Sequence, residues 1–226
     1  MGTETPDGKK LVRRLIARVL AKDYTPDPLL DADTSLAISR ASAVIKGHGG
    51  LLCMQLQHAL AGHDDLVVLP GDDFAISAEA DQLAAEQDID ACRLADLPYD
   101  AATADRTVDV DLIVYNTTDQ SITAYEIKRG HGSVDSGKRR QTLRDGYAVA
   151  AHLRDFARRR GYRVLRSDFK VVSIYGRTGL PVDVTINGDR IDAHFGSAVS
   201  GPLWQSERYL RRCVRAMLDG RDLPRA

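Results

Sequence analysis

The sequence predicts a mixed α/β protein in which a central sheet of mixed strand direction is flanked by helices, in the order αβββαβ. Apolar residues recur at helical spacing after Thr34 and again over residues 137–160. Apolar runs bounded by turn residues indicate one strand at residues 66–69, two within residues 108–130 and one at residues 169–175. The helix before the last strand is the kind of crossover that parallel neighbours require.

The chain is expected to open with a helix and a linker over residues 1–33, ahead of a main domain over residues 34–226. Residues 9–22 place apolar side chains at helical spacing with basic residues between them. This helix is predicted to pack on the main domain or on a second copy of the chain, so a homodimer is kept as a candidate assembly. Pro26 and Pro28 end the helix and begin the linker.

The main domain is predicted to begin with a helix capped by Thr34 or Ser35. Four residues that include three glycines, residues 47–50, are expected to interrupt it, so that residues 51–60 form a second helical piece. Residues 66–69 and 74–77 are predicted to pair as strands around a turn that contains Pro70 and Gly71.

An acidic insertion is predicted over residues 78–105, with one helix at residues 80–87. Residues 64–111 carry many Asp and Glu, whereas residues 128–166 are rich in Lys and Arg. Two interpretations of the basic segment remain open. It binds a phosphate backbone, or it is a solvated helix face paired with the acidic segment.

The C-terminal part continues the α/β order. Asp135 or Ser136 can cap the helix of residues 137–160, and residues 169–175 form a nearly continuous apolar run typical of a central strand. Residues 182–191 are predicted to form a hairpin around an Asn-Gly pair. Residues 202–218 read as a final helix with an apolar stripe and outward arginines.

The two strands within residues 108–130 carry the residues most suited to chemistry. Asp109 and Asp111 are two apart, as are Glu126 and Lys128, so each pair is expected to share one face of its strand. If the strands pair, carboxylates and an ammonium converge at one place. Carboxylate oxygens suit Mg²⁺ or Mn²⁺, and the lysine can activate a water or hold a phosphate.

An Asp before an apolar run, then a turn and a Glu-x-Lys triplet, resembles the PD-(D/E)xK nuclease superfamily, which has the restriction-endonuclease-like fold. The matching residues are Asp111, the apolar run 112–114 and Glu126-Ile127-Lys128, and the resemblance covers residues 34–176. It implies an Mg²⁺-dependent nuclease with Asp111, Glu126 and Lys128 as catalytic residues. It also implies that Asp111, Glu126 and the main-chain carbonyl of Ile127 hold the metal, with Asp109 as the rival first ligand.

The helix after these strands opens with Lys138, Arg140 and Gln141, which are candidates for nucleic-acid binding. Lys138 and Gln141 are three apart and share a helix face, so they are placed to hold the scissile phosphate. Many members of the superfamily carry an additional glutamate on the first helix, but residues 51–60 contain no acid. This departure leaves one metal or two as an open question.

Three functional hypotheses follow. The first is an endonuclease that cleaves DNA in restriction, repair or defence. The second is a non-catalytic member of the same fold that binds nucleic acid or a protein, and the third is an unrelated α/β protein in which an ordinary Glu–Lys pair lies on a solvated face.

The remaining composition predicts a cytoplasmic protein without a membrane segment. Cys53, Cys92 and Cys213 are scattered, with neither disulfide-framework nor zinc spacing, which favours reduced thiols. No apolar run is long enough to span a bilayer, and the N-terminal residues do not resemble a signal peptide.

Overall fold

The computed structural model describes residues 8–130, 132, 135–176 and 178–225. Contacts divide the chain into two compact units, Met1–Ala59 with Ala198–Ala226, and Leu60–Ser197. The boundary expected from the sequence lay after residue 33. The first unit instead takes in most of the second helix and the C-terminal helix as well.

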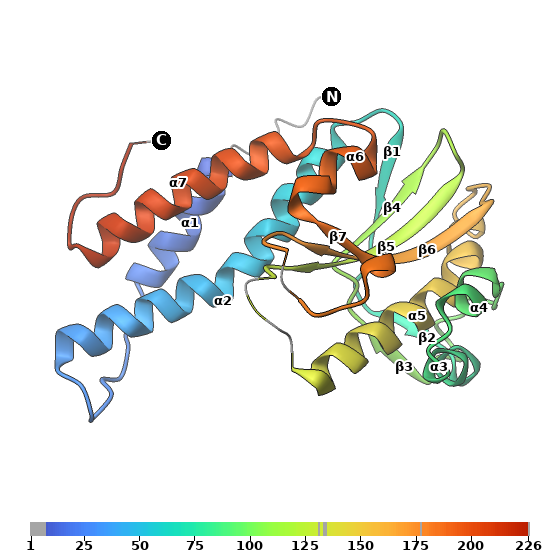
Figure 1. Ribbon diagram of the computed structural model, residues 1–226, viewed down its shortest axis with the longest axis horizontal. Coiled ribbons are helices and arrows are strands. Elements are labelled where there is room, and N and C mark those ends of the chain that lie inside the picture. Colours follow the sequence, from blue (N-terminus) through green and yellow to red (C-terminus); the bar gives the residue numbers. More distant parts are fainter. Residues whose placement is uncertain (1–7, 131, 133–134, 177, 226) are drawn as a thin grey trace. The chain divides into compact units, whose positions relative to one another are not determined.

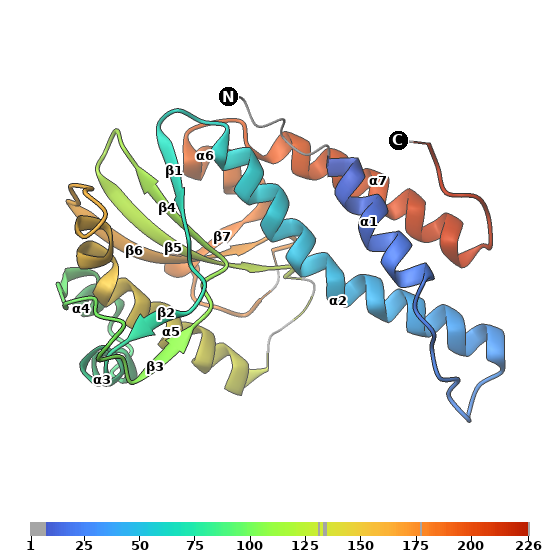
Figure 2. The same cartoon turned by 180° about the vertical axis from the view of Figure 1, so that it is seen from behind.

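The first unit is built from three helices, α1 (Gly8–Leu20), most of α2 (Ala32–Ala61) and α7 (Ser200–Leu218) (Figure 2). The predicted N-terminal and C-terminal helices are therefore confirmed. Their apolar stripes meet in one core, made of Leu11, Val12, Leu15, Ile16, Val19, Val44, Leu51, Tyr209, Leu210, Cys213 and Met217.

Helix α2 runs without a break through residues 47–50, so the predicted interruption is wrong. A Cβ at Gly47 would lie 2.4 Å from a Leu15 methyl carbon, which shows that this glycine lets α1 approach closely. The packing of α1 offsets the conformational cost of glycine within a helix, which is about 1 kcal/mol per residue.

The second unit contains a five-stranded sheet, which confirms the predicted mixed α/β class (Figure 1). The strands, in sheet order, are β1 (Leu66–Leu69), β4 (Leu112–Asn116), β5 (Ser121–Lys128), β6 (Arg166–Ser173) and β7 (Thr185–Asn187). The pairs β1–β4 and β4–β5 are antiparallel, and β5–β6 and β6–β7 are parallel. Helix α5 (Ser136–Arg158), capped by the Asp135 carboxylate, connects β5 to β6.

The predicted pairing of residues 66–69 with residues 74–77 is wrong. Strand β1 pairs with β4, while β2 (Phe74–Ile76) pairs with β3 (Arg106–Val108) in a separate two-stranded sheet. The segment between β1 and β2 does not form a hairpin turn. Instead, its Gly71 carbonyl accepts a hydrogen bond from the Val110 N–H at 3.0 Å, in the segment between β3 and β4.

The hairpin predicted over residues 182–191 is also absent. Strand β7 adds parallel to β6, and a 3-10 turn (Gly188–Arg190) and the short helix α6 (Ile191–Phe195) follow it. The preferred Asn-Gly hairpin turn needs a positive φ at both residues, and neither Asn187 nor Gly188 has one.

Helix α5 covers one face of the sheet, and the insertion packs around it (Figure 1). The insertion contains α3 (Ala78–Ala85) and α4 (Ile89–Leu94), one helix more than predicted. The shared core includes Ile113, Ile122, Tyr147, Val149, Leu153 and Phe156. On the opposite face the Tyr125 hydroxyl contacts the His194 ring of α6, with 2.9 Å between oxygen and Nε2.

Ion pairs join the acidic insertion to the basic helix. Asp81 contacts Arg144 and Arg106, and Arg158 contacts Asp96 at 2.6 Å. For Arg144 and Arg158 the second interpretation of the basic segment is therefore the correct one. Within the described ranges, no helix combines the length and the apolar character needed to cross a membrane.

A buried histidine predicts how stability depends on pH. The His152 ring is 1% exposed; Nε2 accepts the Ser77 N–H at 3.2 Å and Nδ1 faces the Leu97 carbonyl at 3.4 Å. Burial lowers its pKa below the ordinary 6.5, so the unfolded chain takes up the proton first as pH falls. The free energy of unfolding should therefore decrease as pH falls from about 6.5 toward the lowered folded pKa.

Urea unfolding at pH 7.5, 6.5 and 5.5 measures this decrease. Burial also lowers the pKa of His194, so the His152→Gln variant serves to isolate the contribution of His152. Parallel pH profiles for parent and variant would contradict the assignment.

Candidate active site

The two aspartates lie in a short link between strands, not on a strand as predicted. Strand β3 ends at Val108 and β4 begins at Leu112, so Asp109 and Asp111 fall in between. Their carboxylates also accept hydrogen bonds from different segments. Asp109 Oδ1 accepts the Asp73 N–H at 3.2 Å, and Asp111 Oδ2 accepts the Ile127 N–H at 2.7 Å.

The strand register sets Asp111 opposite Glu126. Strands β4 and β5 pair Leu112 with Tyr125 and Ile113 with Ala124, so one further step of the antiparallel register aligns Asp111 with Glu126. Ile113 and Ala124 belong to the core beneath α5. Since side chains alternate along a strand, Asp111 and Glu126 lie on this same face.

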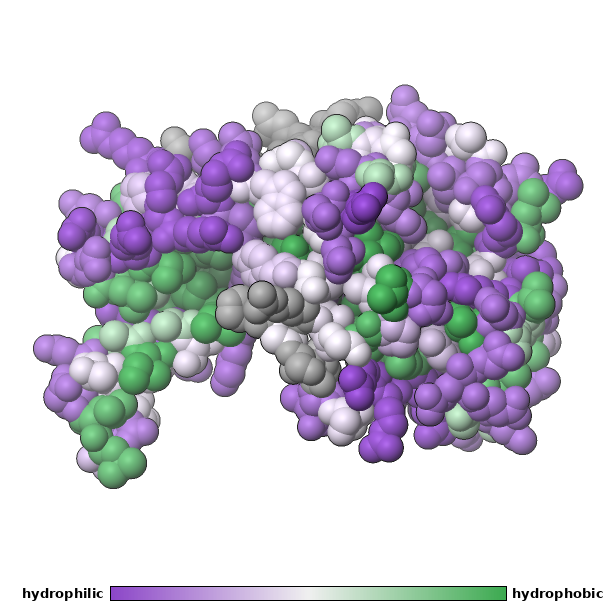
Figure 3. Space-filling model, viewed as in Figure 1, coloured by the Kyte–Doolittle hydropathy of each residue, from purple (hydrophilic) through white to green (hydrophobic). Residues whose placement is uncertain are grey.

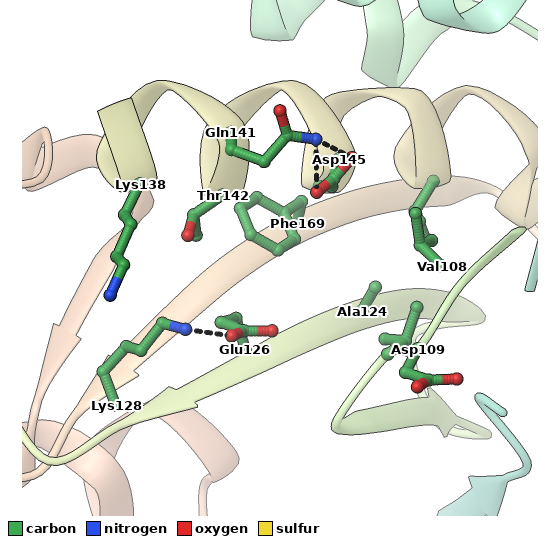
Figure 4. Close-up of a pocket in the computed structure, with 13 residues that line it drawn as sticks. Val108, Asp109, Ala124, Glu126, Lys128, Lys138, Gln141, Thr142, Asp145 and Phe169 are labelled. Atoms are coloured by element: carbon green, nitrogen blue, oxygen red, sulfur yellow. Dashed lines mark hydrogen bonds and ion pairs between the residues drawn. The ribbon is translucent and has the colours of Figure 1, made fainter. Parts of the chain in front are cut away.

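Lys128 follows Glu126 on the same face of β5. Its ammonium donates to Glu126 Oε1 (Figure 4), and the two side chains are 32% and 25% exposed. The ion pair is thus half-buried and open to solvent on one side, which leaves both groups accessible to a small ligand.

The Ile127 carbonyl points toward the β4 side of β5. The Lys128 carbonyl accepts from the Ile174 N–H, next to the end of β6, at 3.0 Å. Successive carbonyls along a strand point to opposite edges, and the N–H and C=O of one residue point to the same edge. The Ile127 carbonyl therefore faces the edge where its own N–H contacts Asp111, beyond the first residue of β4.

Both carboxyls have raised pKa values. For Glu126 the largest cause is desolvation, followed by the nearby charge of Asp111, and Lys128 opposes both. Asp111 is exposed at the end of the sheet, yet surrounding protein atoms desolvate its carboxyl and raise its pKa, while the Ile127 N–H and Lys128 oppose the rise. Two neighbouring carboxylates opposed by a single lysine favour a further cation.

Asp111, Glu126 and the Ile127 carbonyl fit a hard divalent cation that takes only some of its ligands from the protein. Two carboxylates and a backbone carbonyl supply oxygen ligands, which Mg²⁺ and Mn²⁺ prefer. Among the described residues, no group of three or more His, Cys, Asp or Glu could hold a metal ion. Water and substrate oxygens would therefore have to complete the coordination, as is usual for Mg²⁺.

A cavity of about 370 Å³ opens over Glu126 and Lys128 (Figure 4). Helix α5 forms its opposite wall. Gly146 gives the Phe169 ring room, because a Cβ there would lie 2.3 Å from a ring carbon. The cavity is lined by Val108, Asp109, Val110, Ala124, Glu126, Lys128, Lys138, Gln141, Thr142, Asp145, Gly146, Val149 and Phe169.

The predicted phosphate-binding residues are distributed unevenly around this cavity. Lys138 and Gln141 line it, whereas Arg140 is exposed and does not, and Asp111 lies beside it without lining it. The Gln141 amide donates to both carboxylate oxygens of Asp145 at 2.9 Å. Lys138 is thus the cation of α5 best placed to meet an anion in the cavity.

Sequence reasoning missed Asp145. It lines the cavity and forms an ion pair with Arg106, with 2.7 Å between nitrogen and oxygen. Its negative charge also adds to the causes that raise the pKa of Glu126. The signal was present, because Asp145 lies one helical turn after Gln141 and so shares its face.

Comparisons with protein-family models, with curated proteins and with solved structures found no match to this chain.

Proposed function

We propose that this protein is a metal-dependent nuclease that hydrolyses phosphodiester bonds of DNA, on an αβββαβ core of the restriction-endonuclease-like kind. The observation that carries the proposal is the register that sets Asp111 opposite Glu126, on the face that also holds Lys128. A solvated Glu–Lys pair alone would not explain the adjacent aspartate, the Ile127 carbonyl on the same edge of β5, or the cavity over Glu126 and Lys128.

Each residue has a defined role in this proposal. Asp111, Glu126 and the Ile127 carbonyl would hold Mg²⁺ or Mn²⁺. A bound divalent cation supplies charge that stabilises the pentacovalent phosphate and lowers the pKa of water. Lys128 orients the attacking water and offsets the negative charge that develops on the phosphate. Asp109, whose carboxylate already accepts the Asp73 N–H, holds the link in place.

Lys138 provides the next test. Its side chain reaches into the cavity from the first turns of α5 (Figure 4), where a helix N-terminus also favours anions. Lys138→Ala should weaken binding to all DNA sequences alike and lower the slope of log affinity against log salt by about 0.9, the value for one phosphate contact. The measurement is a fluorescence titration in Ca²⁺, which prevents cleavage.

Arg140→Ala is the matched control, because Arg140 lies in the same turns of α5 but outside the cavity. It should change the slope less than Lys138→Ala. Equal slopes for both variants and the parent would show that this end of α5 is only a solvated surface.

The proposed activity is tested by incubating the protein with supercoiled, linear and single-stranded DNA in Mg²⁺, in Mn²⁺ and in EDTA. Cleavage that requires the divalent cation supports the proposal, and the substrate preference separates internal from end cleavage. Binding without cleavage under all conditions would favour a non-catalytic member of the same fold.

A further inference from the structure

Helices α1 and α7 carry cations with almost no opposing charge. Their sequences contain a single acid, Glu207, which is 3% exposed and paired with His48. Besides Arg13, which donates to Tyr209 and Pro224, the exposed cations of the two helices are Lys10, Arg14, Arg18, Arg208, Arg211, Arg212 and Arg215, named here the α1–α7 basic face. The near-neutral charge of the whole chain conceals this local excess.

The basic face differs from the arginine-rich part of α5. Within the part of the chain that the structure describes, arginine–carboxylate pairs involve Arg93, Arg106, Arg144, Arg158, Arg159, Arg166 and Arg221. None of these residues belongs to the basic face. Hydrophilic side chains gather over α7 (Figure 3), and its cations remain available to an external anion.

Tyr209 contacts a cation from each of the two helices. Its ring is 1% exposed, and its hydroxyl accepts a hydrogen bond from Arg13 of α1 at 2.8 Å. The Arg212 guanidinium of α7 lies 5.5 Å from the centre of the same ring. Arg13 of α1 and Arg212 of α7 therefore approach the same ring, at the contact between the two helices.

We infer that the α1–α7 basic face binds the phosphate backbone of duplex DNA, outside the proposed catalytic cavity. Arg208, Arg211 and Arg215 follow one face of α7 over about 10 Å, a length that spans about three phosphates of one strand. Guanidinium groups bind phosphate oxygens through two parallel hydrogen bonds. Such contacts hold DNA without reading its sequence.

A membrane surface fits this face less well. Amphipathic helices that bind membranes insert an apolar stripe between the lipids. The apolar stripes of α1 and α7 are already buried in the core of the first unit, as Leu15 and Leu210 show. What the two helices present outward is charge, which is the complement of a polyanion.

The test compares paired substitutions that each remove two cations. Arg14→Gln with Arg18→Gln alters α1, and Arg211→Gln with Arg215→Gln alters α7. The control, Arg163→Gln with Arg190→Gln, removes two exposed arginines from the second unit. Binding of a fluorescein-labelled DNA duplex is measured in EDTA between about 50 and 200 mM NaCl.

Each basic-face variant should lower the salt slope by about two units, while the control keeps the parental slope. Parental affinity and slope in both basic-face variants would overturn the inference. So would variants that lose binding to phosphatidylcholine vesicles containing phosphatidylserine but keep binding to DNA.

The inference rests on the proposed function only for the choice of DNA as the polyanion. Because DNA binding is measured in EDTA, where no divalent cation is free, a negative binding result is distinguishable from a negative cleavage result. A chain that binds DNA through this face but never cleaves it keeps the inference and removes the nuclease proposal. If the protein cleaves DNA but both basic-face variants keep the parental salt slope, the nuclease proposal stands and this inference is removed.

Discussion

Glu126→Gln is expected to abolish cation-dependent DNA cleavage. The substitution keeps the size of the side chain but removes the negative charge that would hold the metal beside Lys128 and Asp111. Losing about 4 kcal/mol of transition-state stabilisation corresponds to about a thousandfold lower rate. The measurement is the initial rate of plasmid cleavage in Mg²⁺, together with a thermal melt to show that the fold is intact.

Asp109→Asn is the matched control, since it likewise removes one carboxylate charge, from the link that also contains Asp111. Asparagine can still accept the Asp73 N–H, so the link should keep its position and most of the activity. Loss of activity in Asp109→Asn, with activity retained in Asp111→Asn, would show that Asp109 is the true first ligand.

Gly71→Ala should impair both folding and cleavage. An added Cβ would lie 2.4 Å from the Val110 carbonyl oxygen, a backbone atom in the link between the two aspartates. Relieving this overlap must displace the link or the turn, which we expect to cost about 1–3 kcal/mol of stability. A shift of about 1 Å at Asp111 would lower the cleavage rate about a hundredfold.

Gly49→Ala is the control for this prediction. No atom lies within 4 Å of a Cβ at Gly49, and alanine favours a helix over glycine. Urea unfolding and the cleavage rate at saturating DNA measure both effects. If Gly71→Ala matches Gly49→Ala in both measurements, the turn at Gly71 does not position Asp111.

Local patterns predicted the elements that surround the site. Alternation along residues 121–128 placed Glu126 and Lys128 on one face of a strand, and Asp135 marked the start of α5. The pairing of the two strands also follows from local pattern, because a short turn joins them, but Asp111 was expected on the strand and lies in the link before β4. These features depend on residues close together in the sequence.

The features that the sequence did not predict depend on contacts between distant segments. The close fit of Gly47 against Leu15 lets α2 continue through a glycine cluster. The contact of Gly71 with Val110 directs β1 to β4 rather than to β2. The helix spacing puts Asp145 on the face of Gln141, but its place beside Glu126 depends on how α5 packs on the sheet face that carries Glu126.

The central claim is that Asp111, Glu126 and the Ile127 carbonyl together hold one catalytic cation. The most direct measurement is the anomalous scattering of Mn²⁺ soaked into crystals of the protein. We predict a peak with all three groups at about 2.0–2.3 Å from the ion, and its loss in Glu126→Gln crystals. Mn²⁺ bound elsewhere in a protein that still cleaves DNA, with nothing at these groups, would contradict the account.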